Sequence, residues 1–321
     1  MSKILKKKAN LKEGEIVPLH WDAAFKIMYA NEEHLEILTV LLSKVLNIDY
    51  NLLEGNVSLL PLESTNKTVD EKKCEKDVRV SVKADRDYNI TIEVNIRAKK
   101  YQNIIDRNIY YMHKDSGHIL KEGMDYDAIP YTILINFNNF FINQKRKKVF
   151  EEFYYRDDCG NKLTEKDRIL NINIEECYRL WYNHEYQGKF EPYEEELVLL
   201  CAAMMADKEE NFHNIVNMVE MKPEIKVLME GLVKQMSHDE ELVTEYKTWK
   251  NEEERIQSSI IKEERRNSFN EGIAKGITQG IAQKCKEMVL NMYNENIPLE
   301  VIAKCANLTL DEVKEIIDNN Q

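Results

Sequence analysis

The sequence predicts an α/β fold, in which a mixed β-sheet flanked by helices is followed by a mostly α-helical C-terminal region. Three observations predict this fold. Residues 77–96 alternate apolar and polar side chains on either side of a cluster of turn formers, as the two strands of a hairpin do. Residues 131–137 are almost continuously apolar, which is typical of a buried central strand. From about residue 176 the pattern is helical almost to the end.

The composition indicates a protein without a membrane segment. The 321 residues are 43% hydrophobic, which is enough for a sizeable core, and the length suggests two domains. No apolar run reaches the length that spans a bilayer, and the basic N-terminus lacks the apolar stretch of a signal peptide. The six cysteines are scattered without a C-x-x-C pair, which favours reduced thiols over disulfides or a zinc site. We therefore expect a cytoplasmic protein with no membrane partner.

Charge is distributed unevenly along the chain. The net charge is −12, yet residues 1–150 hold 24 Lys and Arg against 21 Asp and Glu. Residues 151–321 hold 21 against 36. The first half is therefore the part suited to a phosphate backbone, and the contrast indicates two functional parts.

The residues before the hairpin divide into three segments. Residues 1–18 read as a loose basic arm, and residues 20–26 as an aromatic segment. Residues 32–46 are predicted to form a helix, because their leucines recur at helical spacing.

The residues after the hairpin continue the alternation of helices and strands. A helix is predicted over residues 99–120, and further strands over 149–155 and 169–174. The expected organisation therefore has three parts. They are a sheet domain over residues 1–175, a helical region over 176–286, and a small helix-turn-helix-like segment over 287–321.

The C-terminal segment carries the signals of two short helices. Asn307 marks the turn, and Thr309 with Glu312 three residues later forms a capping box. Six apolar residues are expected to form a small core: Val301, Ile302, Leu308, Leu310, Val313 and Ile316. Such a unit can dock on DNA, but its second helix holds four acidic residues and one lysine, which would repel phosphate. We expect a protein contact instead, giving a homo-oligomer through the C-terminal helices.

Three glycines recur every four residues at Gly272, Gly276 and Gly280. They lie on one face of a helix and permit close helix packing. The same spacing equally indicates a weak helix, because each glycine costs about 1 kcal/mol relative to alanine.

The hairpin brings two carboxylates together. Buried valines must oppose buried isoleucines, so residue 78 pairs with 92, and Asp77 then lies opposite Glu93 on the polar face. Directly opposed residues have Cβ atoms roughly 5 Å apart, and like charges at that distance destabilise a sheet. A divalent cation such as Mg²⁺ would relieve the repulsion and supply hydrolytic chemistry. The alternative is a hairpin whose charges are simply solvated.

Several short motifs occur together in a recognisable order. Asp22-x-x-Phe25-Lys26 comes first, Asp77-Val78 and the run Ile92 to Asn95 (IEVN) follow, and Arg107-x-x-Tyr110-Tyr111 and Gly123-x-x-Tyr126 come after them. Over residues 18–140 this order resembles that of a bacterial family of recombination-promoting nucleases and transposases. That family belongs to the PD-(D/E)-x-K nuclease superfamily.

The resemblance implies a restriction-endonuclease-like sheet that cuts double-stranded DNA with Mg²⁺ or Mn²⁺ in recombination or in a mobile element. It implies that Asp77 and Glu93 are catalytic metal ligands. It assigns Glu36 as an additional helix-borne acid, with Glu32 and Glu33 as rivals. Four basic residues are candidates for DNA contact: Lys26, Arg97, Lys99 and Arg107.

The sequence departs from the motif at Asn95, which we count among the catalytic candidates. The superfamily has a lysine here and this family usually a glutamine. An asparagine reaches less far toward an attacking water, and Lys99 or Lys100 are candidates to replace it. Two functions therefore stay open: a metal-dependent DNA endonuclease, and a catalytically degenerate member that binds DNA or protein. A third reading, a helix-turn-helix regulator, is disfavoured by the acidic C-terminus.

Overall fold

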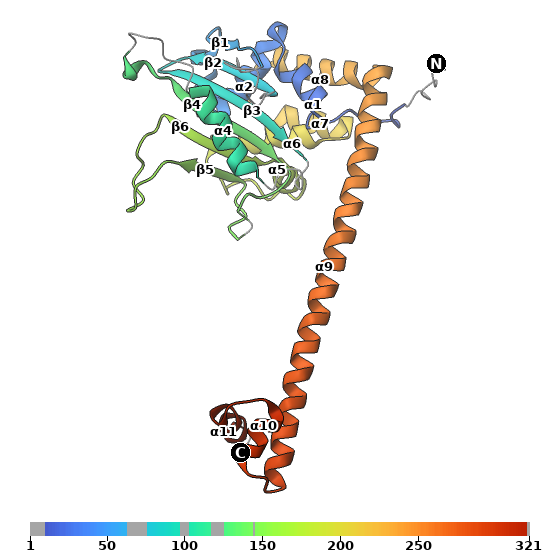
Figure 1. The fold of residues 1–321 in the computed structure, drawn as a ribbon. Coiled ribbons are helices and arrows are strands. Elements are labelled where there is room, and N and C mark those ends of the chain that lie inside the picture. The colour runs from blue at the N-terminus through green and yellow to red at the C-terminus, as the bar shows by residue number, and fades with distance from the viewer. Residues whose placement is uncertain (1–9, 63–75, 97–102, 117–124, 144, 320–321) are drawn as a thin grey trace, which may run out of the picture. The chain divides into compact units, whose positions relative to one another are not determined.

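The computed structural model describes residues 10–62, 76–96, 103–116, 125–143 and 145–319 (Figure 1). The chain divides into two compact units between Asn251 and Glu252. The helices that follow the sheet, up to residue 246, share one apolar core with it. The three-part division after residues 175 and 286 stays a prediction. Within the described part of the chain, no helix is long and apolar enough to cross a membrane.

The elements alternate between helices and strands up to residue 173 and are helical thereafter, as predicted. The strands are β1 (Val57–Leu59), β2 (Val78–Lys83), β3 (Asp87–Asn95), β4 (Tyr131–Asn138), β5 (Phe150–Tyr154) and β6 (Asp167–Asn173). The helices up to β6 are α1 (Asp22–Tyr29), η1 (Glu32–His34), α2 (Leu35–Leu46), α3 (Tyr50–Leu53), α4 (Ile104–Ser116) and η3 (Tyr126–Ala128). The later helices are α5 (Ile174–Tyr182), α6 (Pro192–Met205), α7 (Glu209–Met218), α8 (Pro223–His238), α9 (Glu240–Asn294), α10 (Leu299–Ala306) and α11 (Leu310–Asp318).

Six strands among the described residues form one mixed sheet in the order β1-β2-β3-β4-β6-β5. Strands β3, β4 and β6 run parallel, and the pairs β1–β2, β2–β3 and β5–β6 are antiparallel. The mixed α/β sheet predicted from the sequence is confirmed, with β4 in its interior. The hairpin register is confirmed as well, because Val78 pairs with Ile92 and Val80 with Ile90.

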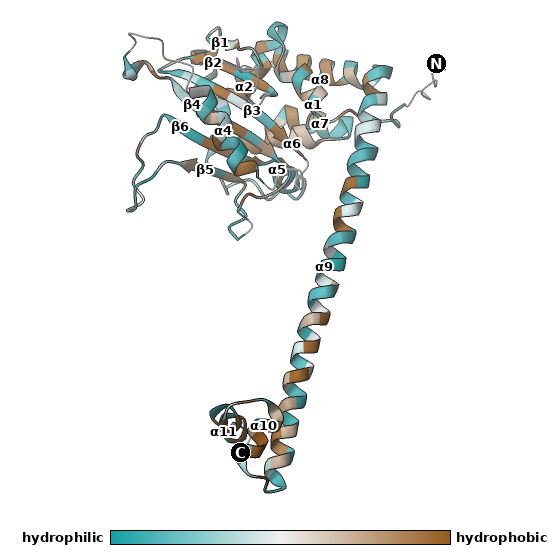
Figure 2. Cartoon of the chain, viewed as in Figure 1, coloured by the Kyte–Doolittle hydropathy of each residue, from teal (hydrophilic) through white to brown (hydrophobic). Residues whose placement is uncertain are grey.

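The two faces of the sheet differ in chemistry. One face carries the buried valines and isoleucines of β2, β3 and β4, which belong to the same apolar core as residues of α1, α2, α5 and α6. Phe25 of α1 reaches this face and lies 6.0 Å from the ring of Phe137, measured between centroids. The other face is more polar and is crossed by α4, whose Met112 packs on Leu134 and Ile169 (Figures 1 and 2).

The N-terminal segment is not a loose arm where the structure describes it. Ile16, Val17 and Leu19 are buried in the main core, with at most 4% of each side chain exposed. The backbone N–H of Ile16 donates to the carbonyl of Asp207 at 3.0 Å. The prediction was therefore wrong for residues 10–18, because a short apolar segment between lysines gave no periodic signal. Residues 1–9 lie outside the described residues.

The smaller unit, residues 252–321, has its own apolar core of Val289, Ile302, Ala303, Val313 and Ile317. The turn at Asn307 adopts the left-handed conformation (φ 55°), and Thr309 and Glu312 form the predicted capping box. The predicted core was wrong at two positions. Val301 is 44% exposed and Leu310 is 40% exposed.

Candidate active site

The β2–β3 hairpin sets Asp77 against the end of β3. Asp77 stands one residue before β2, and its Oδ2 accepts a hydrogen bond of 2.7 Å from the backbone N–H of Val94. Because Val78 pairs with Ile92, Asp77 falls opposite Glu93 on the polar face of the sheet. The register that the apolar pattern predicted therefore does bring the two carboxylates together.

Both carboxylates lie largely out of water. Only 16% of the Asp77 side chain and 6% of the Glu93 side chain are exposed. Burial, and after it the neighbouring Asp22, raise the pKa of Asp77 to about 6. Burial and then the charge of Asp77 raise the pKa of Glu93 to about 8. Two buried acids that disfavour each other's ionisation are typical of a functional site.

Helix α1 places one acidic and one basic side chain, Asp22 and Lys26, beside the carboxylate pair. Lys26 Nζ lies 3.4 Å from Asp77 Oδ1 and 2.9 Å from Asp22 Oδ1. Asp22 and Lys26 are four residues apart, so they share one face of the helix. The candidate Lys26 thus belongs to the site, and Asp22 joins it without having been assigned a role from the sequence. The signal was available, since Asp22 opens the D-x-x-F-K motif.

Helix α4 closes the site from the other side through Arg107. Its guanidinium donates to Oδ1 of Asn95 and lies 3.7 Å from Oε2 of Glu93. The side-chain amide nitrogen of Asn95 donates in turn to Oδ1 of Asn136 on β4 at 3.1 Å. The oxygen and the nitrogen of the Asn95 amide are therefore both hydrogen-bonded to other side chains, so the amide is poorly placed to orient a water.

A third cation, Lys76, lies beside the pair and was missed in the sequence. Its side chain is buried, with 1% exposed, and its positive charge counteracts the rise in the pKa of Glu93. Its Nζ lies 5.6 Å from the ring centroid of Tyr111, and Arg107 lies over the same ring at 5.5 Å. Both cations therefore lie close to the same tyrosine ring. A lysine next to a catalytic candidate is not distinctive in a lysine-rich segment, so no pattern singled it out.

The donor set fits a divalent cation. Oε1 of Glu93 is buried and has no hydrogen-bond partner among the residues that the structure describes. An unpartnered carboxylate oxygen beside a second carboxylate suits Mg²⁺, which takes one or two carboxylates together with water and phosphate. Another convergent acidic group, Asp157–Cys159, is wholly exposed in the described turn between β5 and β6.

The remaining candidates lie elsewhere or outside the description. Glu36 is in the first turn of α2, where its charge acts on Tyr50 of α3. Glu32 and Glu33 are exposed in η1. The structure thus places Asp22 beside Asp77, and it places Glu36 against α3. Arg97, Lys99 and Lys100 fall in residues 97–102, outside the described part of the chain.

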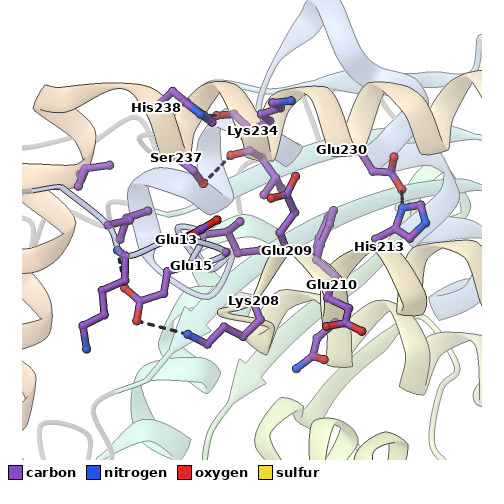
Figure 3. Close-up of a pocket in the computed structure, with 18 of the residues that line it drawn as sticks. Glu13, Glu15, Lys208, Glu209, Glu210, His213, Glu230, Lys234, Ser237 and His238 are labelled. Atoms are coloured by element: carbon purple, nitrogen blue, oxygen red, sulfur yellow. Dashed lines mark hydrogen bonds and ion pairs between the residues drawn. The ribbon is translucent and has the colours of Figure 1, made fainter.

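The largest cavity that we describe is not at this site. It has a volume of 1070 Å³ and lies between residues 10–16, the start of α7 and helix α8 (Figure 3). Two polar contacts cross its lining, between Glu15 and Lys208 at 3.3 Å and between His213 and Glu230 at 2.7 Å. The largest described cavity therefore lies apart from the two buried carboxylates, which form the candidate active site.

Comparison with known proteins finds one family model that covers most of the chain. The model of a family described as PD-(D/E)XK nuclease family transposase matches residues 19–260. The match includes the sheet, the helices around it and the residues of the site. No curated protein and no solved structure matches the chain.

Proposed function

Since the chain belongs to the PD-(D/E)XK nuclease family transposases, we propose that it is a metal-dependent endonuclease that hydrolyses phosphodiester bonds in double-stranded DNA. We further propose that it acts in the cytoplasm, in recombination or in a mobile element. The observation that carries the proposal is the buried pair of Asp77 and Glu93, whose pKa values are raised to about 6 and about 8.

Each residue around the pair has a part in the proposed reaction. Asp77 and Glu93 hold Mg²⁺ or Mn²⁺, which when bound lowers the pKa of a water and stabilises charge on the phosphate. The N–H of Val94 and the ammonium of Lys26 keep Asp77 in position. Arg107 and Lys76 place positive charge where a phosphate gains negative charge during hydrolysis.

DNA approaches, on this proposal, at the edge where the parallel strands end. The site lies at the end of β3, and the turn that follows β4 lies at the same edge because β3 and β4 are parallel. That turn carries the exposed run Lys145, Arg146, Lys147 and Lys148. Its four positive charges suit the phosphate backbone in spite of the net charge of −12.

Cleavage of supercoiled plasmid tests the proposal. The full chain is incubated with Mg²⁺, Mn²⁺ or EDTA, beside Asp77→Asn and Glu93→Gln. Asp87→Asn is the matched control, because Asp87 is an exposed acid at the far end of β3. We expect metal-dependent nicking that disappears in the first two variants and persists in the control. Nicking that survives both substitutions would refute the assignment.

A second function is favoured by one observation. Asn95 stands where the superfamily has a lysine, and both ends of its amide are engaged by Arg107 and Asn136. A catalytically degenerate protein would bind DNA or protein without cutting. Well-folded wild-type protein that binds DNA and nicks nothing with either metal would support this second function.

We also propose that α9 joins two copies of the chain. Four exposed apolar residues recur every four positions along it, namely Phe269, Ile273, Ile277 and Ile281 (Figure 2). A Cβ atom added to a neighbouring glycine such as Gly276 would meet nothing within 4 Å in the described part of the chain, so a second helix has room to approach. Ile273→Lys with Ile277→Lys is expected to convert a dimer into a monomer in sedimentation equilibrium, and a monomeric wild type would refute this assembly.

A further inference from the structure

A small apolar slot opens on the polar face of the sheet, between α4 and strands β5 and β6. Its volume is 160 Å³, well below the roughly 300–1,000 Å³ of pockets that take drug-sized ligands. The apolar lining comes from both sides of the slot: Ile105, Ile109 and Met112 from α4, and Phe153 of β5, Ile169 of β6 and Tyr155 just after β5. The slot therefore has room for one flat ring system.

One polar group in the lining has no hydrogen-bond partner among the described residues. Asn108 lines the slot with 2% of its surface exposed, and its Oδ1 has no hydrogen-bond partner among the described residues. A buried amide oxygen without a donor is costly, which points to a ligand that brings an N–H group. The half-buried Asp167 adds a further acceptor to the same lining, whereas Oδ1 of Asn171 already accepts a hydrogen bond from the side chain of Asn138 at 3.3 Å.

Two partly exposed aromatic side chains, Phe153 and Tyr155, form one wall of the slot. Phe153 is 42% exposed and Tyr155 is 37% exposed, although both are large apolar groups. The hydroxyl of Tyr155 is hydrogen-bonded to Nε2 of His113 at 2.7 Å, and the two rings stack with planes 15° apart. This contact fixes the tyrosine against α4, so the wall is preformed.

The slot lies within reach of a strand bound at the active site. Arg107, which contacts Glu93, is followed directly by Asn108. Glu93 pairs with Asn136, which pairs with Asn171, so these three side chains stand in one row on one face. Neighbouring strands are about 4.8 Å apart, which places Asn171 roughly 10 Å from Glu93. That spacing corresponds to one or two nucleotides along a strand.

We propose that this slot binds a single unstacked nucleobase of the DNA that is being cut. The base lies against Phe153 and Tyr155 and donates an N–H to Oδ1 of Asn108. The inference rests on the proposed nuclease function and adds a specificity site to it. A base is the ligand that combines a flat apolar ring, hydrogen-bonding edges and an attached phosphate.

The surroundings favour a nucleotide over an apolar side chain of a partner protein. Ile142 lines the slot and is followed closely by the exposed basic run from Lys145 to Lys148. Positive charge beside an aromatic slot matches a phosphate joined to a base. A leucine or phenylalanine side chain would leave Oδ1 of Asn108 unsatisfied.

Binding of two single-stranded oligonucleotides tests the inference. One is an oligothymidylate, whose ring N–H is a donor, and the other has the same length but abasic sugars. Binding of the full chain is measured in EDTA, so that no strand is cut. The variants are Phe153→Ala, Asn108→Leu and the control Tyr126→Ala, in which Tyr126 is a 79% exposed aromatic residue outside the slot.

We expect Phe153→Ala to weaken binding of the base-bearing strand about tenfold and to leave the abasic strand unchanged. Asn108→Leu, which keeps the volume of the slot, is expected to weaken the same strand selectively, and Tyr126→Ala neither. Equal effects on both strands, or none, would overturn the slot while leaving nuclease activity standing. Absence of binding to either strand by the wild type would also overturn the slot, whereas the nuclease function is tested separately by plasmid cleavage with Mg²⁺ or Mn²⁺.

Discussion

Arg107 donates a hydrogen bond to the side-chain oxygen of Asn95, which ties helix α4 to the last residue of β3. The amide nitrogen of Asn95 donates to Asn136 on β4. The residue at the motif's third position thus joins three elements around the carboxylate pair. The main role of Asn95 in the structure is therefore to hold Arg107 in place, where its guanidinium lies 3.7 Å from Oε2 of Glu93.

Asn95→Leu is expected to lower the free energy of unfolding by about 1–3 kcal/mol, because the buried partners lose their hydrogen bonds. Asn95→Lys restores the superfamily residue but sets a second cation against Arg107. We therefore expect it to lower both stability and plasmid cleavage. Urea unfolding and the nicking assay measure the two effects. Faster cleavage by Asn95→Lys at unchanged stability would show that Asn95 is only a weakened catalytic residue.

Asp22, and not Glu36, is expected to be the helix-borne acid of the site. The carboxyl group of Asp22 acts on Asp77, whereas Glu36 acts on Tyr50. Asp22→Asn is expected to weaken Mn²⁺ binding about 10- to 100-fold, as loss of groups that support metal ligands does. Glu36→Gln is the matched control and should leave Mn²⁺ binding unchanged. A larger loss in Glu36→Gln than in Asp22→Asn would reverse the assignment.

Lys76 is expected to support cleavage without holding the metal. Lys76→Met keeps most of the buried stem and removes the charge beside Glu93. We expect cleavage at saturating Mn²⁺ to fall about a hundredfold, the usual scale for one lost electrostatic contact in a reaction. The affinity for Mn²⁺ should not fall, because a cation next to the ligands repels the metal.

Lys83→Met is the control for Lys76→Met, since Lys83 is exposed at the other end of β2. It should leave both cleavage and Mn²⁺ binding as in the wild type. Parallel loss of metal binding and cleavage in Lys76→Met would show that the lysine only holds the site together.

The raised pKa of Glu93 predicts how stability depends on pH in EDTA. The folded protein holds this proton up to about pH 8, whereas the ordinary value of 4.5 applies to the unfolded chain. Between these values the folded state binds more protons, so the free energy of unfolding falls as pH rises. Glu93→Gln should remove most of that slope, as followed by urea unfolding between pH 5 and pH 8. Parallel slopes in the two proteins would contradict the raised pKa.

Much of the fold could be predicted because it depends on local periodicity. Alternation over residues 77–96 predicted the hairpin and its register, and register in turn placed Asp77 opposite Glu93. The apolar run at 131–137 predicted an interior strand, since β4 has strands on both sides. These features follow from which side chains must leave water.

What could not be predicted depends on contacts between distant segments. Lys76 is buried and lies 5.6 Å from the ring centroid of Tyr111 on α4, and the sequence does not reveal that packing. Glu36 lies in a predicted helix and Asp22 in the aromatic segment, and the sequence alone does not show which of the two acids lies near Asp77. The fold places Asp22 beside Asp77 and Glu36 near Tyr50. Ile16 and Val17 were assigned to an arm because their hydrogen-bond partners, Asp207 and Ser237, lie far away in the sequence.

The most direct test of the central claim is Mn²⁺ binding, followed by electron paramagnetic resonance as free Mn²⁺ is lost on titration with protein. The account predicts that the wild type binds Mn²⁺ and that Asp77→Asn and Glu93→Gln each weaken binding by more than the 10- to 100-fold typical of supporting residues. Asp87→Asn should bind as the wild type does. Equal Mn²⁺ affinity in all four proteins would contradict the claim that Asp77 and Glu93 together hold a divalent cation.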